Sequence, residues 1–335
     1  MRYLFELSKD HKTLPTAEVL SCLKAEKISY KTLYSNKNVL VIDTDNNYEK
    51  IKLIAIRLSS SFYIDEFLFS CPPSLDTIKK VALENNIRKK GSIAVKHLNR
   101  STKINSQDIV KTLSKVYTKN RKVNLEKPDI EVRAVITDSK VYVGLKLFKI
   151  NRSQYEQRKV QFRPFFSPIS LHPKLARTLV NLSCIKKYNT LLDPFCGTGG
   201  ILLEAGLIGA KVIGSDIEEK MIKGCKKTLE YYNIKDYTLF HCDVGDIVKH
   251  VENVDAVVTD LPYGKSTTTH GEATVSLYQR AFENISKVLK KNGRAVIGLS
   301  DEGLITTGLE YLSFLEKHEL RVHRSLTRFF VVFKK

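Results

Sequence analysis

Several features that mark other protein classes are missing from this sequence of 335 residues. No apolar run approaches the roughly 18 residues of a membrane-spanning helix, so no membrane span is predicted. The N-terminal apolar run is broken by Glu6, Lys9 and Asp10, which argues against a secretory signal. The six cysteines form no C-x-x-C pair, so we expect no metal site and reduced thiols in a cytoplasmic protein. No internal repeat or low-complexity segment is present.

Positive charge is plentiful and unevenly distributed along the chain, whose formal net charge is +19. Residues 1–71 carry 10 Lys and Arg against 9 Asp and Glu, residues 72–150 carry 18 against 7, and residues 151–335 carry 27 against 20. A basic segment of this density favours a polyanionic partner such as a nucleic acid. A lysine-rich solvated surface would give the same composition, so charge alone leaves both interpretations open.

Turn residues and periodicity divide the chain into four parts. Residues 1–71 mix alternating strands with amphipathic helices and predict a ferredoxin-like α+β module. A proline pair opens residues 72–150, which predict a second α/β module with three short strands in 122–148. Residues 151–168 have weak periodicity and predict a linker. In residues 169–335, helices alternate with apolar strands, which predicts a Rossmann-like, doubly wound and mostly parallel sheet with ligand crevices at the carboxyl ends of its strands.

A glycine-rich turn, DPFCGTGG (193–200), follows the first apolar strand of the Rossmann-like part. Its glycines allow a tight turn and close approach of a ligand. Asp216 ends the next strand and can accept hydrogen bonds from ribose hydroxyls, while Asp243 or its neighbours can reach an adenine amino group. We expect an adenosine cofactor to be bound by Asp193, Phe195, Cys196, Gly197, Thr198, Gly199, Asp216, Ile217, Asp243 and Val244. NAD enzymes and S-adenosylmethionine enzymes share such a turn, so this motif leaves the class open.

A second motif, Asp260-Leu261-Pro262-Tyr263, directly follows another apolar strand. Methylation of an exocyclic amine needs two acceptors for the amine hydrogens and a flat surface that holds an extruded base. Asp260 can supply one acceptor, the Leu261 carbonyl, exposed by the following proline, can supply the other, and Tyr263 can stack on the base. An ordinary strand-end turn is the alternative. The position of the motif after a glycine-rich turn and two strand-end carboxylates favours catalysis of amine methylation with S-adenosylmethionine.

Three segments resemble known families. DPFCGTGGILLEAG (193–206) and TDLPYG (259–264) resemble the cofactor and catalytic motifs of the RNA guanine-N2 methyltransferases, whose Asp/Asn-Pro-Pro-Tyr/Phe pattern is changed here at Leu261. VNLEKPDIEVRAVI (123–136) resembles a THUMP domain, an RNA-binding module of tRNA-modifying enzymes. Together the segments are similar to the archaeal type of tRNA guanine-10 N2-methyltransferase.

The resemblance implies a class I methyltransferase domain at 169–335, preceded by a ferredoxin-like module and a THUMP domain at 72–150. It implies S-adenosylmethionine as cofactor, tRNA as partner, mono- or dimethylation of guanine 10, and a monomer without an obligatory activator subunit. Charge and location suggest RNA contacts at Lys96, Arg100, Arg133 and Arg163. A different tRNA or rRNA guanine, or an RNA-binding protein with an inactive methyltransferase domain, remains open. The Asp260 motif disfavours an NAD oxidoreductase, and the THUMP-like segment disfavours a DNA amine methyltransferase.

Overall fold

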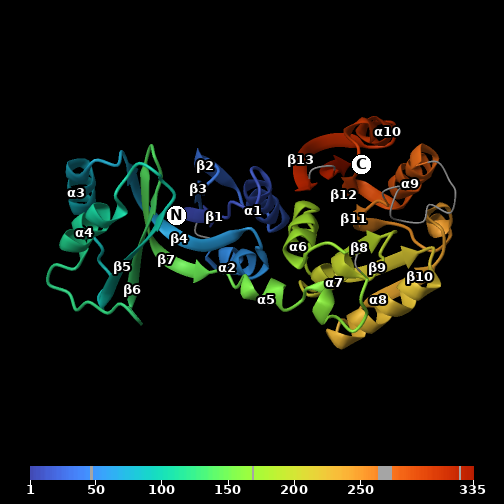
Figure 1. Ribbon diagram of the computed structural model, residues 1–335, viewed down its shortest axis with the longest axis horizontal. Coiled ribbons are helices and arrows are strands. Elements are labelled where there is room, and N and C mark those ends of the chain that lie inside the picture. Colours follow the sequence, from blue (N-terminus) through green and yellow to red (C-terminus); the bar gives the residue numbers. More distant parts are fainter. Residues whose placement is uncertain (46–47, 168–169, 263–273, 324–325) are drawn as a thin grey trace. The chain divides into compact units, whose positions relative to one another are not determined.

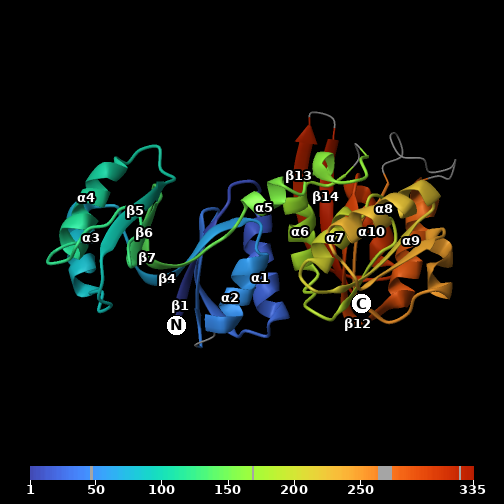
Figure 2. The same ribbon diagram turned by 90° about the horizontal axis from the view of Figure 1, so that it is seen from below.

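A computed structural model describes residues 1–45, 48–167, 170–262, 274–323 and 326–335. The chain forms two compact units, each made of discontinuous segments (Figures 1 and 2). Unit 1 consists of residues 1–16, 28–56 and 60–151, and unit 2 consists of residues 17–27, 57–59 and 152–335. Among the helices described, none combines the length and the apolar character needed to cross a membrane.

Unit 1 is built on one seven-stranded sheet. In spatial order its strands are β2 (Tyr30–Ser35), β3 (Val39–Thr44), β1 (Arg2–Leu7), β4 (Ser61–Cys71), β7 (Val141–Lys149), β6 (Ile130–Ile136) and β5 (Ile93–Asn99). Its helices are α2 (Tyr48–Arg57), α3 (Leu75–Glu84) and α4 (Ser106–Tyr117), and α1 (Leu14–Ala25) starts in this unit. The β1-α1-β2-β3-α2-β4 order with β1 and β4 side by side is the expected ferredoxin-like arrangement.

The two N-terminal modules expected from the sequence share this sheet, because β4 pairs with β7 over most of its length. A second difference concerns the three short strands expected in residues 122–148. The structure has only β6 and β7 there, and Val123 makes a single isolated bridge to Ile93. The Asn124 side chain accepts hydrogen bonds from the backbone amides of Glu126 and Lys127, and this local turn ends the pairing.

Unit 2 contains a second seven-stranded sheet. Its order is β10 (Tyr237–His241), β9 (Lys211–Asp216), β8 (Thr190–Asp193), β11 (Val254–Asp260), β12 (Leu289–Leu299), β14 (Leu326–Lys334) and β13 (Ser313–His323). The first five strands are parallel, and the β13–β14 hairpin adds an antiparallel edge. The strand order reverses beside β8, which is where a doubly wound sheet opens a ligand crevice. The expected Rossmann-like fold is confirmed.

Helices cover both faces of this sheet, with α7 and α8 on one side and α9 on the other (Figure 1). The helical segments of unit 2 are α5 (Ser153–Glu156), the 3-10 turn at Val160–Phe162, α6 (Pro173–Leu182), α7 (Gly200–Gly206), α8 (Glu219–Tyr231), the 3-10 turn at Val244–Lys249, α9 (Thr274–Val288), the 3-10 turn at Glu302–Leu304 and α10 (Ile305–Leu309). Buried residues of α9, such as Tyr278 and Phe282, pack on β11, β12 and β14 to form the core of one face.

Residues 152–167, which make up most of the linker expected at 151–168, are instead packed into unit 2. Arg158 makes two hydrogen bonds to the fully buried Glu204 of α7, at 2.8 and 3.0 Å. Arg177 of α6 contacts the same carboxylate at 2.8 Å. A bidentate arginine pair inside the protein fixes the segment, which weak periodicity could not reveal.

Candidate active site

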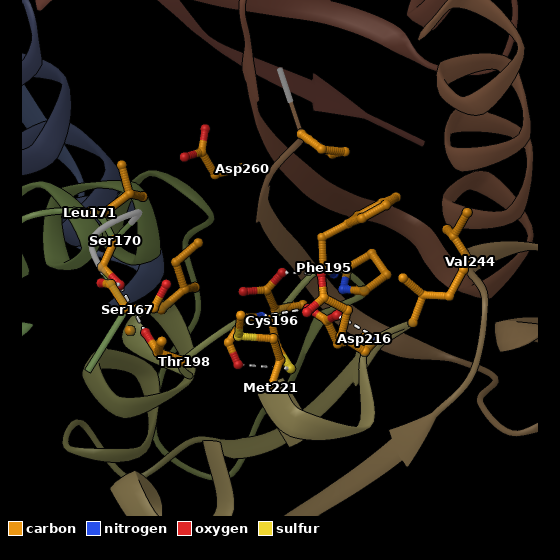
Figure 3. A pocket seen from close by; sticks show the side chains of 18 of the residues that line it. Ser167, Ser170, Leu171, Phe195, Cys196, Thr198, Asp216, Met221, Val244 and Asp260 are labelled. Atoms are coloured by element: carbon orange, nitrogen blue, oxygen red, sulfur yellow. Dashed lines mark hydrogen bonds between the residues drawn. The ribbon is translucent and has the colours of Figure 1, made fainter. Parts of the chain in front are cut away.

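A cavity of about 530 Å³ lies at the carboxyl ends of β8, β9 and β11 in unit 2. Its volume is in the range of sites that bind small molecules. Figure 3 shows Asp260, Phe195, Cys196 and Asp216 around this cavity, with Ser167 and Ser170 on one side and Val244 on the other. Every residue predicted to bind the cofactor, apart from Gly199, lines it, namely Asp193, Phe195, Cys196, Gly197, Thr198, Asp216, Ile217, Asp243 and Val244.

The glycine-rich turn connects β8 to α7 and needs two glycines for different reasons. Gly197 has φ +48°, and no atom lies within 4 Å of the position that a Cβ would take there. Gly199 has φ +80° at the N-cap of α7, and a Cβ there would lie 2.6 Å from the sulfur of Cys225. The turn is therefore open toward the cavity at Gly197 and closed against α8 at Gly199.

Two carboxylates shape the inner part of the cavity. Asp193 is almost fully buried and accepts hydrogen bonds from the Thr259 hydroxyl at 2.7 Å and the Phe195 amide at 3.2 Å. Burial raises the pKa of Asp193 to about 7. Asp216 accepts from the amides of Gly197 at 2.9 Å and Glu218 at 3.0 Å, and burial still raises its pKa. These amides hold the Asp216 carboxylate at the end of β9, beside the glycine-rich turn.

Cys196 and Asp243 differ in their charge. Hydrogen bonding with Cys225 and burial keep the pKa of the Cys196 thiol well above its usual value, so the residue has no nucleophilic thiolate. Burial acts to raise the pKa of Asp243, but hydrogen bonds from Arg280 and from the Gly245 amide lower it below the usual value. The cavity therefore holds a thiol in its neutral form and a carboxylate in its ionised form.

The turn after β11 carries the predicted amine site. The Asp260 carboxylate lies 3.0 Å from a guanidinium nitrogen of Arg328 on β14. The Leu261 amide donates to the Gly298 carbonyl of β12 at 3.1 Å, and the hydroxyl of Tyr278 on α9 donates to the Pro262 carbonyl at 3.0 Å. These bonds fix the backbone on both sides of the Leu261 carbonyl. Tyr263, predicted to stack on the base, lies outside the described residues.

Among the site residues that were not predicted from the sequence, Thr259, Tyr278 and Arg328 contact Asp193 or the turn after β11. Thr259 could have been found, because it directly precedes Asp260 and faces Asp193 across neighbouring strands. Tyr278 and Arg328 come from elements far along the chain, and no motif or periodicity marks them. The role of Arg328 follows only from the tertiary pairing of β11, β12 and β14, and that of Tyr278 from the position of α9 beside the turn.

The four basic residues suggested as RNA contacts lie in different environments. Lys96 is half-exposed and pairs with Glu131 at 3.3 Å, and Arg100 is partly buried with one nitrogen 3.3 Å from the Leu7 carbonyl. Arg133 and Arg163 are only 6% and 5% exposed, so neither guanidinium is presented to RNA. Charge in the sequence could not distinguish a buried arginine from a surface one.

The carboxylates, the open backbone at Gly197 and the cavity volume fit S-adenosylmethionine, whose sulfonium and ammonium groups are positively charged. Together with the strand order and the Asp260 turn, these features define an S-adenosylmethionine-dependent methyltransferase. Sequence profiles agree, since the RMKL-like methyltransferase domain matches residues 161–329. A DNA methylase profile matches residues 19–227, a range that ends before Asp260.

Relatives extend the match to the full chain. The tRNA (guanine(10)-N2)-dimethyltransferase of Methanothermobacter thermautotrophicus is 34% identical over 98% of both chains. The protein of the same name from Pyrococcus abyssi is 37% identical over 72% of this chain and 74% of its own length. The crystal structure of TrmN from Thermus thermophilus covers 100% of both chains with a TM-score of 0.59 at 18% identity, which supports the fold. The chain belongs to the RMKL-like methyltransferases and, over nearly its whole length, to the tRNA (guanine(10)-N2)-dimethyltransferase family.

Proposed function

We propose that this protein methylates the exocyclic amine of guanine 10 in tRNA, once or twice. The observation that carries the proposal is the turn after β11, which brings the Asp260 carboxylate to the cavity that suits the cofactor and fixes the backbone around the Leu261 carbonyl. The choice of guanine 10 is supported by the names of the relatives, one of which covers 98% of this chain.

The residues around the cavity have separable tasks toward the cofactor. The cofactor supplies a methyl group bound to a sulfonium sulfur, and the electrons of the broken C–S bond stay on that sulfur. The open backbone at Gly197 would admit close approach, and Asp216 would accept hydrogen bonds from the ribose hydroxyls. Ile217 and Val244 line the cavity where they would enclose the adenine, and Asp243 or its neighbours would reach the adenine amino group.

The residues of the β11 turn act on the amine. Asp260 and the Leu261 carbonyl accept the two amine hydrogens, so that the nitrogen lone pair leaves conjugation with the ring and becomes available for attack. The surplus proton passes to Asp260 or to water. Tyr263 is the proposed stacking surface for the extruded base.

Residues 72–150 are the proposed THUMP domain and bind tRNA through the basic side chains of unit 1. Helices α3 and α4 and the segments after them present exposed cations, namely Lys79, Lys80, Arg88, Lys89, Lys90, Lys111, Lys115 and Lys119. Phosphate contacts of this kind give affinity that falls steeply with salt. Lys96 and Arg100, which are partly exposed, stay within the proposal.

Mass-spectrometric mapping of an unmodified tRNA transcript after incubation with the protein and S-adenosylmethionine tests the proposal. We expect N2-methylguanosine or N2,N2-dimethylguanosine at position 10. The Asp260→Ala variant should lose methyl transfer by about 10²-fold or more while its tRNA affinity stays nearly unchanged. Methylation at another guanine would correct the position, and full activity of Asp260→Ala would remove the assigned role of that carboxylate.

We also propose that the protein works in the cytoplasm as a monomer without an activator subunit. The mapping experiment checks the absence of an activator, because only the purified chain is present. Light scattering of the active sample should give the mass of a single chain, 38.2 kDa. Activity that appears only after a second protein is added would contradict the proposal.

A further inference from the structure

Arg328 has an unusual place in the cavity. The described residues that line the cavity include five carboxylate side chains, those of Asp193, Asp216, Glu218, Asp243 and Asp260. Arg328 is the only lysine or arginine among the lining residues that the structure describes. It contacts Asp260 at 3.0 Å, beside the turn that carries the proposed amine site.

The sheet brings these two side chains together across an intervening strand. Asp260 on β11 lies in register with Gly298 on β12, and Gly298 lies in register with Phe330 on β14, two residues beyond Arg328. A side chain at position 298 would collide with the Asp260 carboxylate, because a Cβ there would overlap its Oδ1 atom. The glycine therefore leaves an open path over β12 along which Arg328 reaches Asp260.

Asp260 is supported both through its side chain and through the turn that follows it. The Arg328 guanidinium contacts Oδ2, and Oδ1 occupies space beside Gly298 that a Cβ at that position would fill. The next two residues of the turn are fixed as well, by the Leu261 amide on the Gly298 carbonyl and the Tyr278 hydroxyl on the Pro262 carbonyl. Such double support is what an acceptor needs if it must meet an amine hydrogen in one orientation.

Charge gives a second reason for the arginine. Asp260 interacts electrostatically with Asp193 of β8 and with Tyr278 of α9. Two carboxyl groups this close do not readily ionise together, so a nearby cation is needed if both are to lose their protons. A protonated carboxyl offers a hydrogen where the amine needs an acceptor. The guanidinium stays charged at every working pH and favours the ionised form of its partner.

We propose that Arg328 is a positioning residue for Asp260, which it keeps ionised and turned toward the amine of the bound guanine. The inference rests on the proposed amine methylation, because it gives Arg328 no task apart from Asp260. It does not depend on guanine 10, so the test can use whichever RNA the wild-type protein methylates.

The first test compares Arg328→Gln with Arg328→Lys and with Arg321→Gln, a control at an exposed position of β13. For Arg328→Gln we expect kcat to fall about 10- to 100-fold, with the Kd of S-adenosylmethionine within about twofold of wild type. The acidic limb of its pH–rate profile should move to higher pH, and lysine should restore part of both effects. A kcat within threefold of wild type and an unmoved acidic limb would overturn the proposal.

A double-mutant cycle with Asp260→Asn separates positioning from an independent role of Arg328. If Arg328 acts through Asp260, adding Arg328→Gln to Asp260→Asn should lower the single-turnover rate by no more than about twofold. A further loss as large as in the wild-type background would mean that Arg328 contacts the RNA itself. If Arg328→Gln no longer binds S-adenosylmethionine, Arg328→Lys replaces it in the double-mutant cycle. Methylation of no RNA by the wild-type protein would reject the proposed function, whereas an active wild type with an insensitive Arg328 would reject only this inference.

Discussion

Arg133 in unit 1 and Arg328 in unit 2 use the same device in different surroundings. Each extends across a glycine on the neighbouring strand toward an aspartate one strand further, Arg133 over Gly144 to Asp65 and Arg328 over Gly298 to Asp260. In both cases a Cβ on the glycine would collide with the side chain of the aspartate. Both glycines lie within strands, and each is required because the aspartate side chain lies too close to leave room for a Cβ.

The surroundings of the two arginines differ in burial and in charge. The Arg133 side chain is 8% exposed, lies 3.3 Å from the centre of the Tyr63 ring and pairs with Glu6, Asp65 and Glu131, all nearly inaccessible. Arg328 and Asp260 are 14% and 17% exposed and border the cavity. The buried Arg133 cluster connects β1, β4 and β6. The Arg328–Asp260 pair borders the cavity, where it can position a carboxylate for a substrate.

The largest expected effect is the loss of Arg133. Arg133→Met keeps much of the volume but removes the cation that pairs with the buried Glu6 and Asp65, which should cost unit 1 about 3–5 kcal/mol. Glu131 keeps its contacts with Lys96 and Lys146. Hydrogen exchange of amides in β1, β4 and β6 measures this free energy locally, with amides of β11 and β12 as the internal control. A loss below about 1 kcal/mol would mean that Arg133 is not the centre of the cluster.

The second prediction concerns pH. Burial raises the pKa of Asp65 to about 7, despite the opposing effect of Arg133, from an ordinary value of 3.8. In the folded protein the carboxyl keeps its proton up to about pH 7, while the unfolded chain loses it near 3.8. The contribution of Asp65 to the free energy of unfolding is therefore complete below pH 3.8 and is lost as the pH rises to about 7.

Asp65→Asn should remove this pH dependence from unit 1, which we expect to amount to about 2–4 kcal/mol between pH 4 and 8. Hydrogen exchange at several pH values, corrected for intrinsic rates, gives the measurement. The amides around β8 should keep their own pH dependence. The pKa of Asp193 is also raised to about 7, and the substitution does not change that residue. Equal slopes in variant and wild type would contradict the role of Asp65.

Much of unit 2 could be predicted from the sequence, because its signals are local. The apolar strands, the glycine-rich turn and the carboxylates at strand ends are contiguous, and parallel strands bring their carboxyl ends to one edge. Asp193, Asp216 and Asp260 therefore meet at the cavity, as expected for this fold.

The arginines could not be assigned in the same way. Arg133 lies in the strongly basic segment 72–150 and looked like an RNA contact, but its partners Glu6 and Asp65 come from distant strands. Arg328 lies 68 residues after Asp260 on an antiparallel strand, and only the register over Gly298 connects them. Gly144 and Gly298 are not flanked by the turn residues that mark other functional glycines. Their role can be seen only when the pairing of the strands is known.

The two glycines give the smallest and most direct contrast. A Cβ at position 144 would lie 2.8 Å from the Asp65 Cβ and 2.8 Å from the Glu66 carbonyl oxygen. Neither atom can move without the backbone, so Gly144→Ala should cost unit 1 about 1–3 kcal/mol. A Cβ at position 298 would instead collide with the far end of the Asp260 side chain, which can rotate into the cavity at a cost below about 1 kcal/mol.

Rotation of the carboxylate separates Asp260 from its fixed position, so Gly298→Ala should lower kcat about 10- to 100-fold while stability is nearly kept. Gly144→Ala should show the reverse, with a normal kcat at temperatures where unit 1 stays folded. Hydrogen exchange and single-turnover methylation of both variants complete the comparison. If Gly298→Ala stayed active and lost stability instead, Gly298 would serve packing in unit 2 as Gly144 does in unit 1. The distinction between a structural Arg133 and a functional Arg328 would then not hold.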